Sequence, residues 1–456
     1  NYFMTHYQSV QAAEADVNIY VAEMRFFRAL EYFNKIQLLG DVPWLEVDLN
    51  VDSEELYGPK MKRNQVFQKI IEDLDFAIQW LPEAGSEEAN RLNKDIARHV
   101  KARFCLNEGT HYKYHDELEY ASEAEKWLQM AATESDKLIT SGRYEIYNTG
   151  HPQEDYFNMY RIDDKSDLKE AVLYVDYKTN IREHNMAAAG REAGCGFSKS
   201  FVESFLCSDG LPISLSNKYL GDETMRKETA NRDPRLKQLI LTNDFPTNVT
   251  DDLKDSTFVV NEDEFITQHC FTGYRPIKGF NPIYSQALYM KSSFDGIAYR
   301  YAETLLINAE AKAELNTITN ADLDRTVNQL RDRVGMPHLT VNVGFTDPKW
   351  PDWGYSLSPV LQEIRRERCI ELAGEGFRFN DLKRWKAGKL LNNVLTYVGK
   401  RKPDGNLAIV YPNYTNPDLS YQAGKSRTWE DKMYLYPIPT GELQRNPQLL
   451  PQNPGW

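Results

Sequence analysis

The segment from Arg365 to Trp385, where Arg and Glu residues crowd around two glycines, constrains the fold more than any other part of the sequence. Apolar and charged residues recur at helical spacing on one face, up to the glycines: Leu361, Ile364, Arg368, Glu371, Leu372 and, between the two glycines, Glu375. A buried charge needs an opposite charge and hydrogen bonds. Gly374 and Gly376 permit a sharp turn. We therefore expect this Arg/Glu segment to form a helix, a break and a second short helix, held together by buried ion pairs.

Composition indicates a large protein with more than one lobe. The 456 residues are 41% hydrophobic, which suffices for a sizeable core. The net charge of -13, without a basic run, argues against nucleic acid and against an anionic membrane surface as partners. No apolar run is long enough to cross a bilayer. The five Cys lack the spacing of a metal or disulfide framework, so we expect buried free thiols.

Hydrophobic periodicity divides the chain into helical and β-like regions. Helices are expected at about 13–39, 64–80, 94–107 (ending near Gly109), 121–140, from Tyr299 onward and at 321–333. Short β-like runs such as 171–175 lie between Gly, Pro, Asn and Asp clusters. The expected fold is mainly α, a tetratricopeptide-like scaffold of helical pairs with an irregular mixed α/β insert. We expect four parts: scaffold at 1–142, insert at 143–296, scaffold with the Arg/Glu segment at 297–390, and an irregular C-terminal segment at 391–456.

Six blocks in order along the chain resemble the SusD/RagB family of nutrient-binding lipoproteins. Besides the Arg/Glu segment, they are Ala22–Leu30 with Gly40-Asp41-Val42-Pro43, Asn231-Arg232-Asp233-Pro234-Arg235-Leu236, Tyr299–Leu306 with Ala309-Glu310-Ala311, Asn328–Gly335, and Tyr434–Pro439 with Asn446–Gly455. The resemblance covers nearly the whole chain. Cys369 and Gly374-Glu375-Gly376 depart from it, because larger residues are common there. These blocks are framework in the family, so they indicate the scaffold and not the ligand.

The resemblance implies non-catalytic capture of an oligosaccharide or polysaccharide. It implies delivery to a SusC-like TonB-dependent transporter in the outer membrane, and a cell-surface location through an N-terminal lipid anchor. The chain begins at Asn1 without Met, directly ahead of a helix, so we expect it to be a fragment that lacks the anchor segment. No cofactor is expected.

A loop between helices, from Phe345 to Tyr355, is the best candidate for sugar contact. A site that binds sugars needs flat aromatic faces for the apolar side of the ring and nearby groups that hydrogen-bond the hydroxyls. The loop offers Trp350, Asp352, Trp353 and Tyr355, and its Pro and Gly residues predict that both Trp are partly exposed. The alternative is that the two indoles pin the loop to the scaffold.

Two further candidates lie in the insert. A Gly-rich run from about Arg182 to Gly196 predicts a mobile loop. The second candidate is the segment from Lys178 through Arg191, with Arg182, His184 and Asn185 as ligand contacts. Tyr274, Tyr284 and Tyr289 form the other, around a β-like run. Their alternatives are a solvated loop and aromatic packing in a core or on a sheet.

Metal and enzyme motifs are weak in this sequence. His111 and His115 are four residues apart but lack the Glu of a zinc protease, and Gly109 suggests an exposed turn with surface histidines. Asp163, Asp164 and Asp167, or Asp251 and Asp252, have the chemistry for calcium without the Gly and Glu of an EF-hand loop. No catalytic or metal-ligating residue is therefore assigned.

Two other classes of protein remain open from the sequence. A helical glycoside hydrolase needs two carboxylates roughly 5–10 Å apart across a cleft, and the abundant Asp and Glu permit it. The arginines around the Arg/Glu segment argue against acid/base work there, because they lower a carboxyl pKa. A helical-repeat adaptor that binds peptides is the third reading.

Overall fold

The computed structural model describes residues 1–86, 90–186, 196–267, 269–409 and 428–456. The chain forms two compact units, one made of Asn1–Leu138, Lys383–Gly388 and Trp429–Trp456, and the other of Ile139–Leu382 and Lys389–Thr428. These units are a division in space, whereas the four expected parts divide the sequence, so those four boundaries stay a prediction. No helix among the described residues has the length and apolarity to span a membrane.

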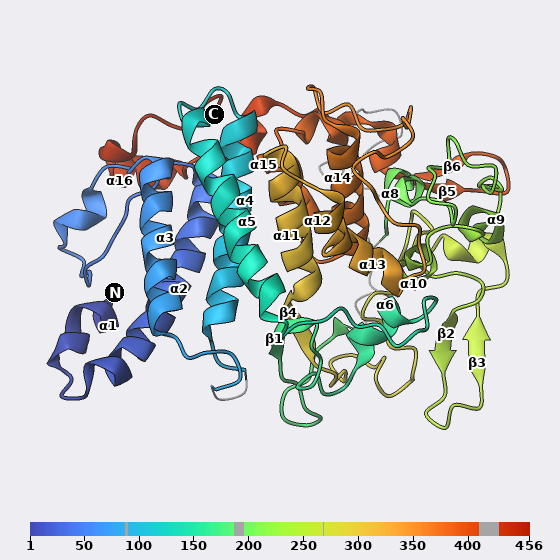
Figure 1. Cartoon of the computed structure of the whole chain (residues 1–456), viewed down its shortest axis with the longest axis horizontal. Coiled ribbons are helices and arrows are strands. Elements are labelled where there is room, and N and C mark those ends of the chain that lie inside the picture. The colour runs from blue at the N-terminus through green and yellow to red at the C-terminus, as the bar shows by residue number, and fades with distance from the viewer. Residues whose placement is uncertain (87–89, 187–195, 268, 410–427) are drawn as a thin grey trace. The chain divides into compact units, whose positions relative to one another are not determined.

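The first unit is helical. Its helices are α1 (Tyr2–His6), α2 (Glu14–Leu39), α3 (Arg63–Trp80), α4 (Lys94–Tyr114), most of α5 (Ala124–Ser141) and α16 (Thr440–Arg445). In Figure 1, α2, α3 and α4 run side by side, and α2 packs on α3, which packs on α4. Aromatic rings fill the space between them, with Phe33 stacked on Phe104 at 3.6 Å between centroids and Phe67 edge-on to Trp127 at 4.8 Å. A buried ion pair joins Arg63 to Glu108 at 2.6 Å.

The predicted helices of this unit are confirmed, but α4 is longer than expected. It passes through Gly109 and ends at Tyr114. A Cβ at Gly109 would lie 2.9 Å from the Leu128 side chain, so this glycine allows α5 to approach closely instead of ending the helix. His111 and His115 are consequently not surface residues, which corrects the prediction. His115 is 1% exposed, its Nε2 lies 2.8 Å from the carbonyl oxygen of Lys383, and its ring stacks on His111.

The second unit mixes helices with small sheets. Its helices are α6 (Asp155–Asn158), α8 (Lys199–Ser204), α9 (Met225–Thr229), α10 (Arg235–Leu239), α11 (Tyr301–Glu314), α12 (Asn320–Asp324), α13 (Val327–Arg333), α14 (Pro359–Glu371) and the start of α15 (Arg378–Arg384). The described residues of this unit form three antiparallel strand pairs: β1 (Ala171–Val175) with β4 (Gly296–Arg300), β2 (Pro246–Val249) with β3 (Ser256–Phe258), and β5 (Val398–Arg401) with β6 (Leu407–Ile409). The mainly helical fold with an irregular insert is confirmed. The helix expected at 321–333 is two short ones, α12 and α13. Of the predicted mobile loop, residues 187–195 lie outside the described residues, as does 410–427 of the C-terminal segment.

The Arg/Glu segment forms the expected helix, break and helix. Ser358 caps α14 through its hydroxyl, which accepts a hydrogen bond from the Leu361 amide, and Pro359 stands at the first turn. Gly374 and Gly376 both have positive φ, at 75° and 84°, which only glycine adopts easily. The charged face of α14 is buried and packs on α11 and α13.

Glu371 lies at the centre of the predicted ion-pair network. It is 0% exposed and accepts hydrogen bonds from Arg333 at 2.6 and 2.7 Å, from Arg300 at 2.7 Å and from Arg235 at 3.0 Å. Arg235 belongs to the Asn231–Leu236 block, Arg300 to β4 and Arg333 to α13. The second acceptors of these guanidinium groups are Asp233, Glu367, Glu170 and Glu375. One carboxylate therefore ties together elements that are far apart along the chain.

Replacing Glu371 by Ala should strongly destabilise the protein. The change leaves three buried guanidinium groups without their shared partner, and breaking a buried pair typically costs about 3–5 kcal/mol. Urea unfolding followed by circular dichroism measures the loss. Glu442→Ala is the control, because Glu442 is exposed and pairs with the exposed Arg445 at 2.8 Å, and it should change the unfolding free energy by less than about 0.5 kcal/mol. A Glu371→Ala variant as stable as the parent would contradict the buried network.

The contribution of Glu371 should also depend on pH. Burial alone would raise its pKa, but the guanidinium groups of Arg333, Arg300 and Arg235 hold the pKa well below its ordinary value. A carboxyl whose folded pKa is depressed stabilises fully above the unfolded value of about 4.3, and loses this contribution as pH falls through the folded pKa. The difference in unfolding free energy between the parent and Glu371→Gln should be constant above about pH 5 and shrink at lower pH. Urea titrations at a series of pH values test this, and a difference that grows on acidification would contradict it.

Candidate functional site

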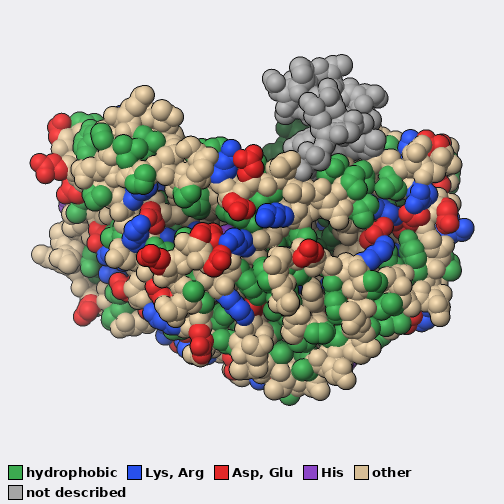
Figure 2. All heavy atoms as spheres, turned by 90° about the horizontal axis from the view of Figure 1, so that it is seen from above, with side chains coloured by type: hydrophobic (Ala, Val, Ile, Leu, Met, Phe, Trp, Pro, Cys, Tyr) green, Lys and Arg blue, Asp and Glu red, His purple; other side chains and the backbone are tan. Residues whose placement is uncertain are grey.

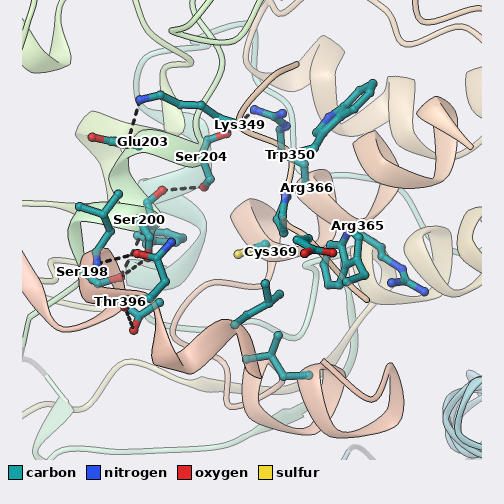
Figure 3. A pocket seen from close by; sticks show the side chains of 18 of the residues that line it. Ser198, Ser200, Glu203, Ser204, Lys349, Trp350, Arg365, Arg366, Cys369 and Thr396 are labelled. Atoms are coloured by element: carbon teal, nitrogen blue, oxygen red, sulfur yellow. Dashed lines mark hydrogen bonds and ion pairs between the residues drawn. The ribbon is translucent and has the colours of Figure 1, made fainter. Parts of the chain in front are cut away.

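A cavity of about 730 Å³ lies in the second unit, between three pieces of chain and the side of α14. Its walls are α8, the 345–355 loop, the α14 residues Gln362, Arg365, Arg366 and Cys369, and the segment from Lys389 to Thr396. Figure 3 shows hydroxyl side chains of Ser198, Ser200 and Thr396 on one side, and Trp350, Arg366 and Cys369 on the other. The cavity combines apolar side chains with hydroxyl, amide and charged groups, the mixture that small-molecule sites use.

Asp347 fixes the 345–355 loop against the scaffold. Its carboxylate accepts hydrogen bonds from Arg366 at 2.6 Å, from the Ser214 hydroxyl at 2.7 Å and from the Lys349 amide at 2.8 Å. Burial would raise the pKa of Asp347, but the bond from Arg366 lowers it below its ordinary value. Asp347 therefore stays ionised and acts as an anchor for the loop.

The two indoles of the loop differ in exposure. Trp350 is half-buried, lines the cavity and donates from Nε1 to Glu363 at 2.7 Å. Trp353 also lines the cavity but is only 5% exposed. It donates to Gln362 at 2.6 Å, and the Arg365 guanidinium lies 4.7 Å from its ring centroid. The expectation that both Trp are partly exposed is therefore wrong for Trp353, which packs between the loop and α14. Both indole N–H groups are held by α14, as the scaffold-pinning alternative predicted.

The other two loop candidates have separate places. Asp352 is exposed, lines the cavity, and accepts a hydrogen bond from the Gly354 amide at 2.9 Å. The Tyr355 hydroxyl accepts from Arg365 at 3.1 Å, and Tyr355 is not among the residues that line the cavity. The loop thus brings Trp350, Asp352 and Trp353 to one site, while Tyr355 supports Arg365 behind it.

The segment with Arg182, His184 and Asn185 pairs with the segment that follows Tyr289, outside the cavity. His184 pairs with Ser292 through backbone hydrogen bonds, and the Asn185 side chain accepts from the Met290 amide at 3.1 Å. Arg182 lies over the Tyr177 ring at 4.9 Å. The His184 ring packs edge-on against Tyr177 and Phe294, and burial lowers its pKa. Among the neighbouring tyrosines, Tyr284 is 53% and Tyr289 74% exposed. Asn185 therefore lies beside the segment that carries Tyr289, whereas Arg182 and His184 contact the partly buried Tyr177, and none of the three lines the cavity.

Tyr274 cannot contact a ligand from this position. It is 0% exposed and belongs to a buried cluster of apolar side chains. Its hydroxyl donates to Glu228 at 2.7 Å and lies 3.3 Å from the Lys199 ammonium, and burial raises the pKa of the phenol well above its ordinary value. The prediction of Tyr274 as a binding residue is corrected, because this Tyr belongs to the buried core, whereas Tyr284 and Tyr289 are exposed.

The sequence patterns do not predict three parts of the cavity wall. Helix α8, the segment from Lys389 to Thr396 and the cavity side of α14 are far apart along the chain, so no local pattern links them. Cys369 is partly exposed, whereas Cys105, Cys207 and Cys270 are buried and Cys195 lies outside the described residues. The departure of Cys369 from the family pattern was a usable signal, because its sulfur points into the cavity in Figure 3.

The acidic clusters considered for calcium are occupied by local hydrogen bonds. Asp164 accepts from the Ser166 amide at 2.9 Å, Asp251 from the Ser285 amide at 2.9 Å, and Asp252 from the Thr250 hydroxyl at 2.7 Å. Within the described residues, no group of three or more His, Cys, Asp or Glu side chains is arranged to hold a metal ion.

Comparison with known proteins identifies the family of this chain. The model of the SusD family matches residues 138–456, so the chain belongs to the SusD family, whose members bind and do not catalyse. The SusD-like protein P2 of Formosa agariphila is 25% identical, over 97% of this chain and 75% of that protein.

Solved structures agree with the fold. A SusD-like carbohydrate binding protein from Bacteroides fragilis NCTC 9343 superposes with a TM-score of 0.70 at 22% identity, over 98% of this chain and 83% of that one. Surface glycan-binding protein A from Bacteroides fluxus gives a TM-score of 0.60 at 17% identity, over 99% and 82%. Sequence identities this low support only the shared fold.

Cys369 should be the reactive thiol among the described cysteines. Burial raises the pKa of Cys207 and Cys270, and also that of Cys105, which disfavours their thiolates, while Cys369 borders the cavity. With N-ethylmaleimide in native buffer, we expect Cys369 to be modified at least about tenfold faster than these three. A time course of peptide mapping by mass spectrometry measures the four rates, and Cys369→Ser is the control. Equal rates at all four positions would show that the cavity does not reach this thiol.

Proposed function

We propose that the protein captures an oligosaccharide in the cavity beside Trp350. The observation that carries the proposal is an indole at the wall of a cavity of about 730 Å³ that also presents serine, threonine, asparagine and glutamine side chains. An indole face suits the apolar side of a sugar ring, and the polar groups suit its hydroxyls. The carbohydrate-binding relative of the same fold supports this choice of ligand.

Capture takes place without bond cleavage. A glycoside hydrolase needs one carboxyl with a raised pKa to protonate the leaving group, opposite a second carboxylate. Of the acidic side chains lining the cavity, Asp347 has a lowered pKa because of Arg366, and Glu203 lies 3.3 Å from the Lys349 ammonium. The lowered pKa makes Asp347 a poor general acid, and the Glu203 carboxylate is engaged by Lys349.

The captured glycan passes to a transporter in the outer membrane. The resemblance of the six sequence blocks supports a SusC-like TonB-dependent partner, a cell-surface location and a lipid anchor on a segment before Asn1. A surface glycan-binding protein with this fold is consistent with that location. The surface that carries Arg182, His184 and Asn185 beside Tyr289 is proposed as an additional contact for longer glycans, because its rings are exposed.

Trp350→Ala should weaken glycan binding without unfolding the protein. The indole is half-buried and its loop stays anchored through Asp347, so the change removes a stacking face worth about 1 kcal/mol or more, roughly fivefold in Kd. A glycan array identifies a ligand, and calorimetry compares the variant with the parent.

Trp456→Ala is the matched control, because Trp456 is 50% exposed in the other unit and should leave affinity unchanged. Trp353→Ala is a poorer test, since this buried ring also packs against Arg365. Unchanged affinity in Trp350→Ala would remove the cavity from the site, and turnover of the bound glycan would instead favour a hydrolase.

A further inference from the structure

The cavity walls carry more basic than acidic side chains, whereas the whole chain carries more acidic than basic ones. The whole protein carries a net charge of -13. On the face in Figure 2, acidic and basic side chains are interspersed. The cavity walls instead carry five basic side chains, Lys349, Arg365, Arg366, Arg378 and Lys389, against three acidic ones, Glu203, Asp347 and Asp352. Arg365 pairs with the buried Glu314, and Arg366 pairs with Asp347 and Glu363, so the positive charge that a ligand can reach lies mainly on the two lysines. Exposed positive charge at a cavity attracts ligands of the opposite sign.

The acidic groups of the cavity are mostly occupied. Asp347 is 4% exposed and is held by Arg366 and by the Ser214 hydroxyl. Glu203 is paired with Lys349, whose side chain is 54% exposed, and Figure 3 shows Lys349 reaching toward this carboxylate. Only Asp352 is exposed to solvent among the acidic groups.

Two lysines are accessible to an incoming anion. Lys389 is exposed and has no ion pair with any described residue. The Lys349 ammonium lies 3.3 Å from Glu203, whose side chain is 18% exposed and also lies 4.0 Å from the Lys199 ammonium. Because the Lys349 side chain is 54% exposed, its pair with Glu203 is weak and exchangeable. An anionic ligand group can take the place of Glu203 at Lys349, and Lys389 is available without displacing a partner.

We propose that the cavity selects oligosaccharides that carry anionic groups, either uronate carboxylates or sulfate esters. This inference rests on the proposed glycan capture and names its ligand class. Trp350 supplies the stacking face, while Lys349 and Lys389 supply charge-assisted hydrogen bonds to the anionic substituents. Neutral sugars of the same backbone make only the stacking and hydroxyl contacts, and so bind less tightly.

The test uses matched pairs of oligosaccharides that differ only in charge. Oligogalacturonides are compared with their carboxyl-reduced forms, and sulfated galactan oligosaccharides with their desulfated forms, on an array that also holds other acidic and neutral glycans. Titration calorimetry of the hits should give at least about tenfold tighter binding for the anionic member. This preference should fall as salt is raised. The two pairs distinguish carboxylate from sulfate as the recognised group.

Charge variants give effects of opposite sign. Lys389→Ala and Lys349→Ala should each weaken binding of the anionic glycan about fivefold to tenfold and leave the neutral one unchanged. Glu203→Gln removes the competitor for Lys349 and should tighten anionic binding, a gain that a merely structural role would not produce. Lys254→Ala is the control, because Lys254 is exposed in the same unit, pairs with Asp252 and lies outside the cavity walls.

Different results would contradict the preference for anions and the capture of glycans. Hits that bind their neutral forms equally well, and that weaken in Trp350→Ala, leave capture in place and overturn the preference for anions. Anionic binding that Lys349→Ala, Lys389→Ala and Glu203→Gln leave unchanged overturns it as well. An array without any bound glycan overturns both proposals.

Discussion

The fold of the second unit depends on a single buried carboxylate. Glu371 has no exposure to solvent and receives hydrogen bonds from three guanidinium groups. Each of those guanidinium groups would be costly to bury alone, and each has a further carboxylate partner, so the network is tolerable only when it is complete. Because its members come from α10, β4, α13 and α14, forming it requires the insert and the helical scaffold to fold together.

The network also determines which side of α14 is available for ligand contact. Glu367 and Glu371 face the buried arginines, whereas Gln362, Arg366 and Cys369 face the cavity. Two other polar side chains of α14 hold the 345–355 loop, since Glu363 and Gln362 accept hydrogen bonds from its two indole N–H groups. The Arg/Glu segment is therefore more than framework, because the helix that organises the core also forms one wall of the candidate site.

Much of the scaffold could be predicted from the sequence, because helical spacing and break residues are local. The helix ends at Leu39 and Trp80 and the burial of Glu371 followed from such patterns. The exceptions have a common cause. The sequence around Gly109 indicates a helix end, but in the structure α5 packs on this glycine. The sequence likewise indicates that Trp353 and Tyr274 lie at the surface, but they contact Arg365 and Glu228 in the interior. In each case a contact distant in sequence reversed the local indication.

The candidate site is harder to predict from the sequence, because folding brings its charged side chains together from distant parts of the chain. The composition of the 345–355 loop marks it as a candidate, but no local sequence pattern connects Lys389 or Glu203 to this loop. In a chain with a net charge of -13, composition argues for no attraction of anions, yet the cavity gathers basic side chains from α14, from the loop and from the segment after α15. Selectivity for a charged ligand follows from this local arrangement of side chains and not from net charge, since screening limits each interaction to about 10 Å in solution.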